Sequence, residues 1–341
     1  MIRAALRDLQ FRRRRFAIAT LGAGLVFGLG ITMSGLSAGF DREVERTVAL
    51  ADADQWIVAD TSAGPFAGNT RLPQDAVGEI AAIPGVTDAG GLIFTPMNVG
   101  EAEEPELVNM FGVEPGHVGA PEALSSPTEA VIDENLDLAV GDTMELSGRS
   151  FDIVGVVRAT MFAGVPNVYI DLGVAQELGF AGGPIVSTVL VQGDAGTLPG
   201  LRAMTNEEVE ENALLNLGDA VTTISMVRTI LWLVAALVIG SVLYLNAQER
   251  TRDFAVFKAT GSTSASIVAG LAVQATAIAA VASVLAIVIG RALVPVMPLT
   301  IETPLSTYLF TPLVVLIVSL LGSLAGARRA ASVPPAVAFG G

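Results

Sequence analysis

The chain of 341 residues is 52% hydrophobic and carries 34 acidic residues, 19 basic residues, one histidine and no cysteine. This hydrophobic share indicates a membrane protein with a soluble part, and the lack of cysteine excludes disulfides and thiol chemistry. The charge is uneven, because residues 41–219 hold 30 of the acidic residues and only six arginines, a balance of −24. Such asymmetry indicates two compartments, and without a large basic face the chain is not expected to bind nucleic acid.

The chain begins with a basic leader at residues 1–15, followed by an uncharged apolar run at residues 16–40. Twenty-five helical residues exceed the hydrocarbon core of a bilayer, which is ~30 Å thick. A signal peptide has a similar basic start, and the small residues around Ser37 and Ala38 resemble a cleavage site. The apolar run is too long for a signal peptide, so we predict a retained membrane anchor with a cytoplasmic N-terminus.

Residues 41–223 are predicted to form an extracytoplasmic α+β domain that is large enough for its own core. Its first eleven residues, DREVERTVALA, are expected to extend the first span as a stalk helix. Short alternating strands between residues 130 and 160 indicate a small barrel or a sandwich. Thr205 and Glu208 form a capping-box pattern, which begins a helix that we expect to run straight into the second span.

Three further apolar runs complete a predicted set of four spans, with both termini on the cytoplasmic side. This arrangement satisfies the positive-inside rule except at Arg291, which falls on the outer side. Gly322 and Gly326 are spaced for close helix packing. Gly24 and Gly28 have the same spacing, although lipid-facing glycine explains this pair equally well. The predicted segments are span two at 224–247, a cytoplasmic helix at 248–263, span three at 267–290, an external loop at 291–304, span four at 305–327 and a cytoplasmic tail at 328–341.

The spans contain no Asp, Glu, Lys, Arg or His apart from residues at their ends, whereas ion pathways and proton relays usually need such groups within the membrane. Their milder polar residues are typical of helix packing. We therefore expect motion to be transmitted along these helices, and we do not expect a hydrophilic solute to cross between them. The mild polar residues are Thr32, Ser34, Gln274, Thr276, Ser283, Ser319 and Ser323.

No residue pattern in the chain indicates catalysis or a bound cofactor. The phosphate-binding pattern G-x-x-x-x-G-K-[ST] is absent from the sequence, so the chain is not expected to bind ATP through such a loop. His117 lacks a second zinc ligand and is predicted to lie on the surface. Glu101, Glu103, Glu104 and Glu106 lack the spacing of a calcium loop and are predicted to be solvated. No Ser, His and Asp grouping indicates a hydrolase, so we predict a chain without catalytic, cofactor or metal sites that is not an enzyme.

The charged stretch ERTRDFAVFKATGS, residues 249–262, lies between two spans and is compatible with a short helix. It resembles the signature of permease subunits of the MacB/FtsX-type (type VII, mechanotransmission) ABC transporters, roughly E-R-x-R-E-[IF]-[AG]-x-x-[KR]-A-x-G-A. Asp253 stands where Glu is usual, Thr260 stands where an aliphatic residue is usual, and the basic pair that often follows the glycine is missing. The matching residues are Glu249, Arg250, Arg252, Phe254, Ala255, Lys258, Ala259 and Gly261.

The resemblance covers the whole order of segments, and it implies a four-span membrane protein of the cell (inner or plasma) membrane with an α+β domain between the first two spans. It implies a permease that dimerises with a second copy of itself and binds two cytoplasmic ABC ATPase subunits, which hold ATP and magnesium. In this family such a stretch acts as a coupling helix, and Phe254 and Phe257 are expected to fill a pocket on the ATPase. The implied coupling residues are Glu249, Arg250, Arg252, Asp253, Phe254, Phe257, Lys258 and Gly261.

Several alternatives remain open at this point. The coupling stretch is also compatible with an amphipathic helix that rests at the lipid interface. The leading interpretation is transmission of ATP-driven motion to the outer domain, for export or handling of a substrate that is already outside the cytoplasm. An FtsX-like signalling subunit that regulates an outer partner, such as a cell-wall hydrolase, uses the same parts. A membrane-tethered enzyme is disfavoured because no catalytic grouping is present.

Overall fold

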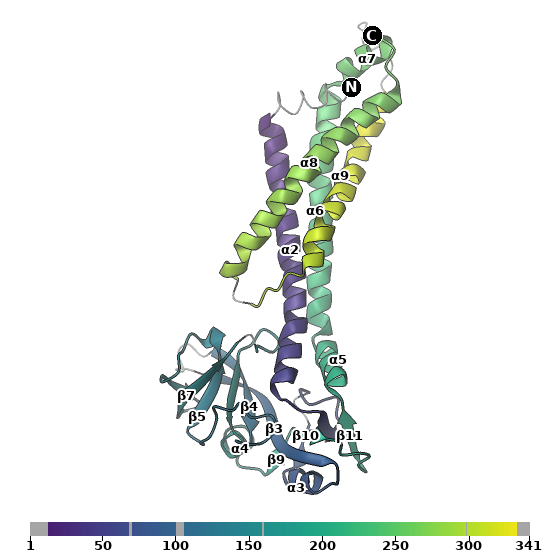
Figure 1. Cartoon of the computed structure of the whole chain (residues 1–341). Coiled ribbons are helices and arrows are strands. Elements are labelled where there is room, and N and C mark those ends of the chain that lie inside the picture. The colour runs from purple at the N-terminus through teal and green to yellow at the C-terminus, as the bar shows by residue number, and fades with distance from the viewer. Residues whose placement is uncertain (1–12, 68–69, 100–105, 159, 298, 333–341) are drawn as a thin grey trace. The chain divides into compact units, whose positions relative to one another are not determined.

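The structure is a computed structural model that describes residues 13–67, 70–99, 106–158, 160–297 and 299–332 (Figure 1). It divides into two compact units, which we call the helical unit (residues 1–38 and 221–341) and the α+β domain (residues 39–220). Most of the predicted basic leader, the acidic residues Glu101, Glu103 and Glu104, and the end of the C-terminal tail lie outside the described residues.

Among the described residues, four helices are long and apolar enough to cross a membrane. The first has 38 residues and the second 32, so they are about 57 Å and 48 Å long. Both exceed a bilayer, and both contribute residues to the helical unit and to the α+β domain. The first helix stays regular to Leu50, as predicted for a stalk. The four helices are α2 (Arg13–Leu50), α6 (Gly218–Glu249), α8 (Ser264–Leu293) and α9 (Leu305–Ser332), with the short α7 (Thr251–Ala259) before α8 and the 3₁₀ turn η2 (Val294–Val296) after it.

The helices of the helical unit pack through small residues. A Cβ atom added at Gly322 of α9 would lie 2.8 Å from the carbonyl oxygen of Ala236 and 3.1 Å from the backbone nitrogen of Gly240, both in α6. A Cβ atom added at Gly24 of α2 would lie 2.7 Å from the Cβ of Leu285 in α8. These glycines therefore allow close approach of the helices, and the packing interpretation of both glycine pairs is confirmed.

One prediction about the second span is wrong. The helix that begins after the Thr205 cap, α5 (Asn206–Asn216), does not continue into α6, because Leu217 adopts φ −88° and ψ 0° and breaks the helix. Gly218 follows this break, and glycine costs about 1 kcal/mol in a helix interior, which favours an interruption here. Because α6 begins at Gly218, before the predicted span, Arg228 lies within the helix although it is near the start of the span.

The α+β domain is built on one sheet of nine strands in the order β11-β1-β10-β3-β4-β8-β5-β7-β6. Val99 at the end of β3 also pairs with Leu146 of β6, which closes the last six strands into a ring. Of the two predicted alternatives, the barrel is therefore the closer description. The strands are β1 (Gln55–Ala59), β3 (Val86–Val99), β4 (Glu106–Val113), β5 (Glu129–Asp133), β6 (Thr143–Leu146), β7 (Arg149–Val157), β8 (Asn167–Asp171), β10 (Thr188–Gly193) and β11 (Leu201–Met204), with β2 (Leu72–Pro73) and β9 (Ile185–Val186) as a separate pair.

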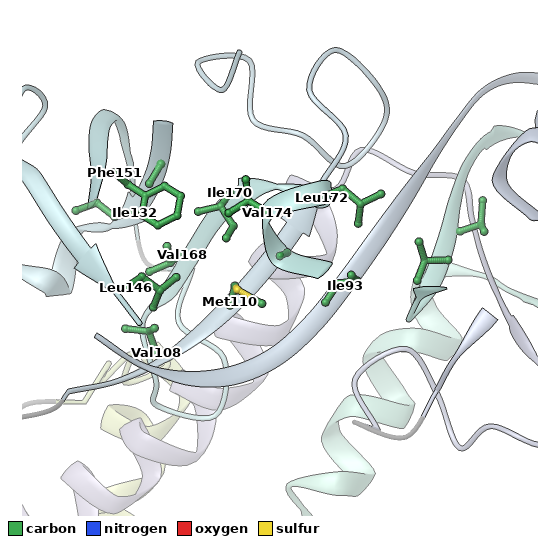
Figure 2. Close-up of a cluster of buried hydrophobic side chains, with 14 of the residues drawn as sticks. Ile93, Val108, Met110, Ile132, Leu146, Phe151, Val168, Ile170, Leu172 and Val174 are labelled. Carbon is green, nitrogen blue, oxygen red and sulfur yellow. The ribbon is translucent and has the colours of Figure 1, made fainter. Parts of the chain in front are cut away.

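The core of the α+β domain lies on both faces of this sheet. Figure 2 shows the aliphatic cluster, in which side chains such as Ile93, Met110 and Val168 gather beneath Leu172 and Val174 of a helix. The other cluster is aromatic, with neighbouring ring centroids 4.8–6.2 Å apart. The helices against the aliphatic cluster are α3 (Asp75–Ala81) and α4 (Leu172–Phe180), η1 (Glu134–Leu136) is a 3₁₀ turn, and the aromatic rings belong to Trp56, Phe66, Phe94, Phe111, Phe162 and Tyr169.

Candidate functional site

Along the chain, helix α7 follows α6 and precedes α8 (Figure 1), and it is shorter than the predicted segment 248–263. Arg250, with φ −101° and ψ 14°, separates it from α6. At its end, Gly261 adopts φ +94° and its N–H donates to the carbonyl of Lys258 at 3.0 Å, while the N–H of Ser262 donates to the carbonyl of Phe257 at 2.8 Å. These two hydrogen bonds form a Schellman cap, in which the residue with left-handed backbone angles is usually glycine. Gly261 therefore ends the helix, two residues before the predicted end of the segment at residue 263.

The inner face of α7 packs on the other helices of the helical unit. Phe254 is 3% exposed, and it shares a hydrophobic cluster with Ala247 of α6, Ile267 and Leu271 of α8, and Ala327 of α9. Phe257 is half-buried against the same cluster. The expectation that Phe254 fills a pocket on a partner therefore needs correction, because its ring is already enclosed within this chain.

Two predicted coupling cations also hold α7 in place. The Nε of Arg250 lies 3.3 Å from the Oδ2 of Asp253, and its guanidinium lies 5.5 Å from the ring centroid of Phe254. The Nζ of Lys258 donates to the carbonyl oxygen of Ala331 at 2.7 Å, in the last turn of α9. A cation at a helix C-terminus is favoured by the unpaired carbonyls there. Lys258 therefore links α7 to the end of α9, while Arg250 packs against the first turn of α7.

The opposite face of α7 is exposed, and we call it the outer stripe. Its members recur at intervals of three or four residues and so lie along one side of the helix. Val256, which is 45% exposed, is the apolar residue of the stripe. The sequence prediction missed Val256, although its spacing from Arg252 and Asp253 carried the signal. The outer stripe consists of Arg252, Asp253, Val256, Ala259 and Thr260, and Glu249 is exposed just before it.

The far end of α2 is fixed in the α+β domain by apolar packing. Val44 and Val48 are at most 1% exposed and belong to the aromatic cluster of the domain. These residues follow the membrane span within the same continuous helix. The stalk is therefore part of the core of the domain.

Buried hydrogen bonds fix the same stalk. The Oγ1 of Thr47 donates to the carbonyl of Thr160 at 3.2 Å, and the Nδ2 of Asn167 donates to that Oγ1 at 3.2 Å. Asp133 accepts from both the N–H and the hydroxyl of Thr160, at 2.8 and 2.9 Å. Glu43 accepts from the N–H of Gly164 at 3.0 Å. Buried polar groups with satisfied partners specify one geometry, so these bonds define how the stalk seats in the domain.

His117 lies on the surface of the α+β domain, as predicted, with a side chain that is 51% exposed. Its Nδ1 lies 2.8 Å from the Oδ1 of Asp88, and this hydrogen bond raises the pKa of His117 above its ordinary value of 6.5. Among the described residues, no group of three or more His, Cys, Asp or Glu side chains is placed to hold a metal ion.

Two family models match the chain. The MacB-like periplasmic core domain matches residues 16–203, and the FtsX-like permease C-terminal domain matches residues 225–335. An ABC transporter permease of Mycobacterium tuberculosis is 38% identical over 348 residues, which cover all of both chains. The chain belongs to the MacB/FtsX-type ABC transporter permeases. A second permease from the same species is 36% identical, again over all of both chains.

Two solved structures are similar to part of this MacB/FtsX-type permease. The extracellular domain of the noncanonical ABC-type transporter YknZ, from Gram-positive bacteria, shows 12% identity with a TM-score of 0.33, covering 45% of this chain and 100% of that one. The periplasmic region of MacB from Actinobacillus actinomycetemcomitans shows 10% identity with a TM-score of 0.35, covering 46% of this chain and 91% of that one.

Membership of the family confirms the predicted fold class, which is a four-span helical membrane protein with an α+β extracytoplasmic domain between the first two spans. The chain is a multi-pass membrane protein, and an ABC transporter permease implies a partner ATPase subunit.

Proposed function

We propose that this permease transmits the motion of a partner ATPase to its extracytoplasmic domain, and that α7 receives the motion. The observation that carries the proposal is that α7 has one exposed face and one buried face. Its outer stripe is exposed, while its inner face is buried against α6, α8 and α9 through Phe254. A push on a helix held in this way moves the helices that it contacts, because close-packed side chains transmit displacement.

The outer stripe has the composition of a small protein-binding surface. Val256 offers an apolar contact between Arg252 and Asp253 on one side and Thr260 on the other. Interfaces commonly place apolar anchors at the centre and polar groups at the rim. We therefore assign direct contact with the ATPase to the outer stripe and Glu249, with Phe257 at its edge, and we assign a positioning role to Phe254, Arg250 and Lys258.

The stalk supplies the output of the same mechanism. Helix α2 is unbroken from Arg13 to Leu50, and its last turns are seated in the domain by Val44, Val48 and Thr47. An unbroken helix with a fixed end transfers tilt or rotation to whatever holds that end. The domain is thus expected to change its arrangement when the membrane helices move.

The proposed assembly contains two copies of this chain and two ATPase subunits, with both termini of the permease and α7 in the cytoplasm. ATP and magnesium bind the ATPase, while this chain contributes no catalytic residue and no cofactor site. The proposed role is export or extracytoplasmic handling of a substrate that has already left the cytoplasm. The comparisons do not favour the signalling alternative.

The proposal is tested by the substitution Val256→Asp in the full chain, co-purified with its ATPase. A charge at the centre of the outer stripe is expected to weaken capture of the ATPase about tenfold or more, since interface anchors contribute roughly 2 kcal/mol or more. The melting temperature of the permease alone is expected to stay unchanged, because Val256 is exposed.

Two control variants separate docking from folding. Val140→Asp makes the same chemical change at a residue of the α+β domain that is 62% exposed, and it is expected to leave capture of the ATPase unchanged. Phe254→Ala is expected to lower the melting temperature of the permease alone, because it empties the buried cluster. Normal capture of the ATPase by the Val256→Asp chain would refute the proposed contact surface.

A further inference from the structure

Arg228 is a cation inside a membrane-spanning helix. It lies in α6 and lines a cavity of about 200 Å³ between α2, α6 and α9. Ionisable residues in membrane-spanning helices usually have a specific partner. In the part of the chain that the structure describes, Arg228 makes no ion pair with a carboxylate.

The contacts of Arg228 are all neutral. Its Nη1 lies 3.2 Å from the Oγ of Ser34, its Nη2 lies 3.4 Å from the Oγ of Ser225, and its guanidinium lies 5.6 Å from the ring centroid of Trp232. Its Nε is buried and has no hydrogen-bond acceptor. A buried donor without an acceptor is unfavourable, so among the described residues Arg228 has no countercharge and its Nε has no acceptor.

The walls of the cavity divide into a polar part and an apolar part. Ser306, Thr307 and Thr311 of α9 line the polar part together with Arg228, and the hydroxyl of Thr311 already donates to the carbonyl of Thr307 at 2.7 Å. The apolar part is formed by Phe27 and Ile31 of α2 together with two apolar residues of α9, and none of the described residues that line the cavity is acidic. A cation and hydroxyl donors beside an apolar wall suit an anion that carries a hydrocarbon chain. The apolar lining residues are Phe27, Ile31, Phe310 and Val314.

The size and depth of the cavity further restrict which ligand can bind there. Its volume of about 200 Å³ is below the roughly 300–1,000 Å³ of sites that enclose a whole small molecule. The 21 residues that separate Arg228 from Glu249 span about 31 Å, which matches a hydrocarbon core of ~30 Å. With Glu249 at one membrane boundary, Arg228 therefore lies at the opposite boundary, at the level of the lipid phosphates.

We propose that this cavity binds the phosphate headgroup of an anionic phospholipid in the leaflet opposite α7. Arg228 supplies the countercharge and its unpaired Nε–H, the hydroxyl groups of Ser306 and Thr307 complete the donor set, and the first part of an acyl chain lies along Phe27 and Ile31. Arg291 provides the contrast. It is exposed and stacks on Tyr308 at 5.4 Å, which is the arrangement of an ordinary interfacial arginine.

The test uses the delipidated full chain in detergent, titrated with dioleoyl phosphatidylglycerol or dioleoyl phosphatidylcholine and followed by native mass spectrometry. The wild type is expected to prefer the anionic lipid, and Arg228→Gln is expected to bind it about tenfold more weakly. Arg228→Lys keeps the charge and is expected to lie between the two. Arg291→Gln is the matched control and is expected to stay within about twofold of the wild type.

A second variant keeps the test decisive if Arg228→Gln does not fold. Thr307→Val removes one hydroxyl from the same cavity without a change of charge and is expected to weaken binding of phosphatidylglycerol about threefold. Equal losses in the Arg228 and Arg291 variants would show non-specific lipid contact and would overturn the proposal. So would displacement of the lipid by inorganic phosphate, which would assign the site to a soluble anion. The test needs no ATPase, so its outcome is independent of the proposed coupling role of α7.

Discussion

In the α+β domain, six aromatic rings pack in one cluster, whereas in the helical unit helices approach each other closely at glycines such as Gly240 and Gly322. The difference follows from the solvent. Water drives large apolar side chains into the core of the domain. Lipid is as apolar as the side chains, so membrane helices gain stability from close approach instead. The domain should therefore be sensitive to the removal of atoms, and the helical unit to their addition.

The largest expected effect tests the first half of this comparison. Phe111 is 1% exposed and contacts three other aromatic rings, so Phe111→Ala should destabilise the α+β domain by about 3–5 kcal/mol. Limited proteolysis of the full chain across a temperature series measures this loss. Leu107→Ala on the same strand, at a residue that is 48% exposed, should change little. Equal sensitivity of the two variants would contradict the assigned aromatic core.

The second prediction adds atoms to the helical unit. Gly322→Ala places a Cβ atom against the backbone of α6, which is unable to yield as a flexible side chain does. Separation of α6 and α9 is expected to cost about 1–3 kcal/mol, in the range of overpacked cores. The measurement is the melting temperature of the full chain in detergent. Gly22→Ala, inside α2 of the same unit, is the matched control, because the nearest atom to an added Cβ there is the Cγ1 of Val238 at 3.9 Å, an ordinary van der Waals distance. A melting temperature unchanged by Gly322→Ala would show that this contact is not tight.

The sequence predicted the larger features of both units, because they depend on local patterns. Apolar length predicted the spans, and the Thr205 capping box is present as expected. The closure of the strands into a ring depends on the pairing of Val99 with Leu146, a contact between distant segments that alternation within a strand does not encode.

The helix α7 was predicted in position, but the orientation of its side chains was not. The family signature located α7, yet it did not show that Phe254 faces inward and Val256 outward. That division depends on how α7 packs on α6, α8 and α9, which the signature alone does not state. The place of Arg228 was also not evident from the sequence. Arg228 lies near the start of the apolar run, but α6 begins before that run, at Gly218, so Arg228 is enclosed within the helix.

The smallest expected effect concerns the surface of the α+β domain, where water weakens each contact. Asp88 accepts from His117 and, at 2.7 Å, from the N–H of Val118. The hydrogen bond to Asp88 raises the pKa of His117 above 6.5. Partial burial raises the pKa of Asp88, but its hydrogen bonds together lower it below 3.8. The contribution of His117 is therefore complete below pH 6.5 and is lost as pH rises through its higher folded pKa. That of Asp88 is present above pH 3.8 and is lost at lower pH.

The pair should thus stabilise this loop most between about pH 3.8 and 6.5, by roughly 0.2–1 kcal/mol, as measured for exposed pairs. Hydrogen exchange at the Val118 amide, corrected for its intrinsic pH dependence, should show protection that falls as the solution becomes basic. Burial raises the pKa of Glu114 in the same loop, which gives a slope of the same sign. The difference between the wild type and His117→Gln isolates the pair. Identical slopes in the two chains would show that His117 contributes nothing, and the surface contacts of the domain would then be weaker than this geometry implies.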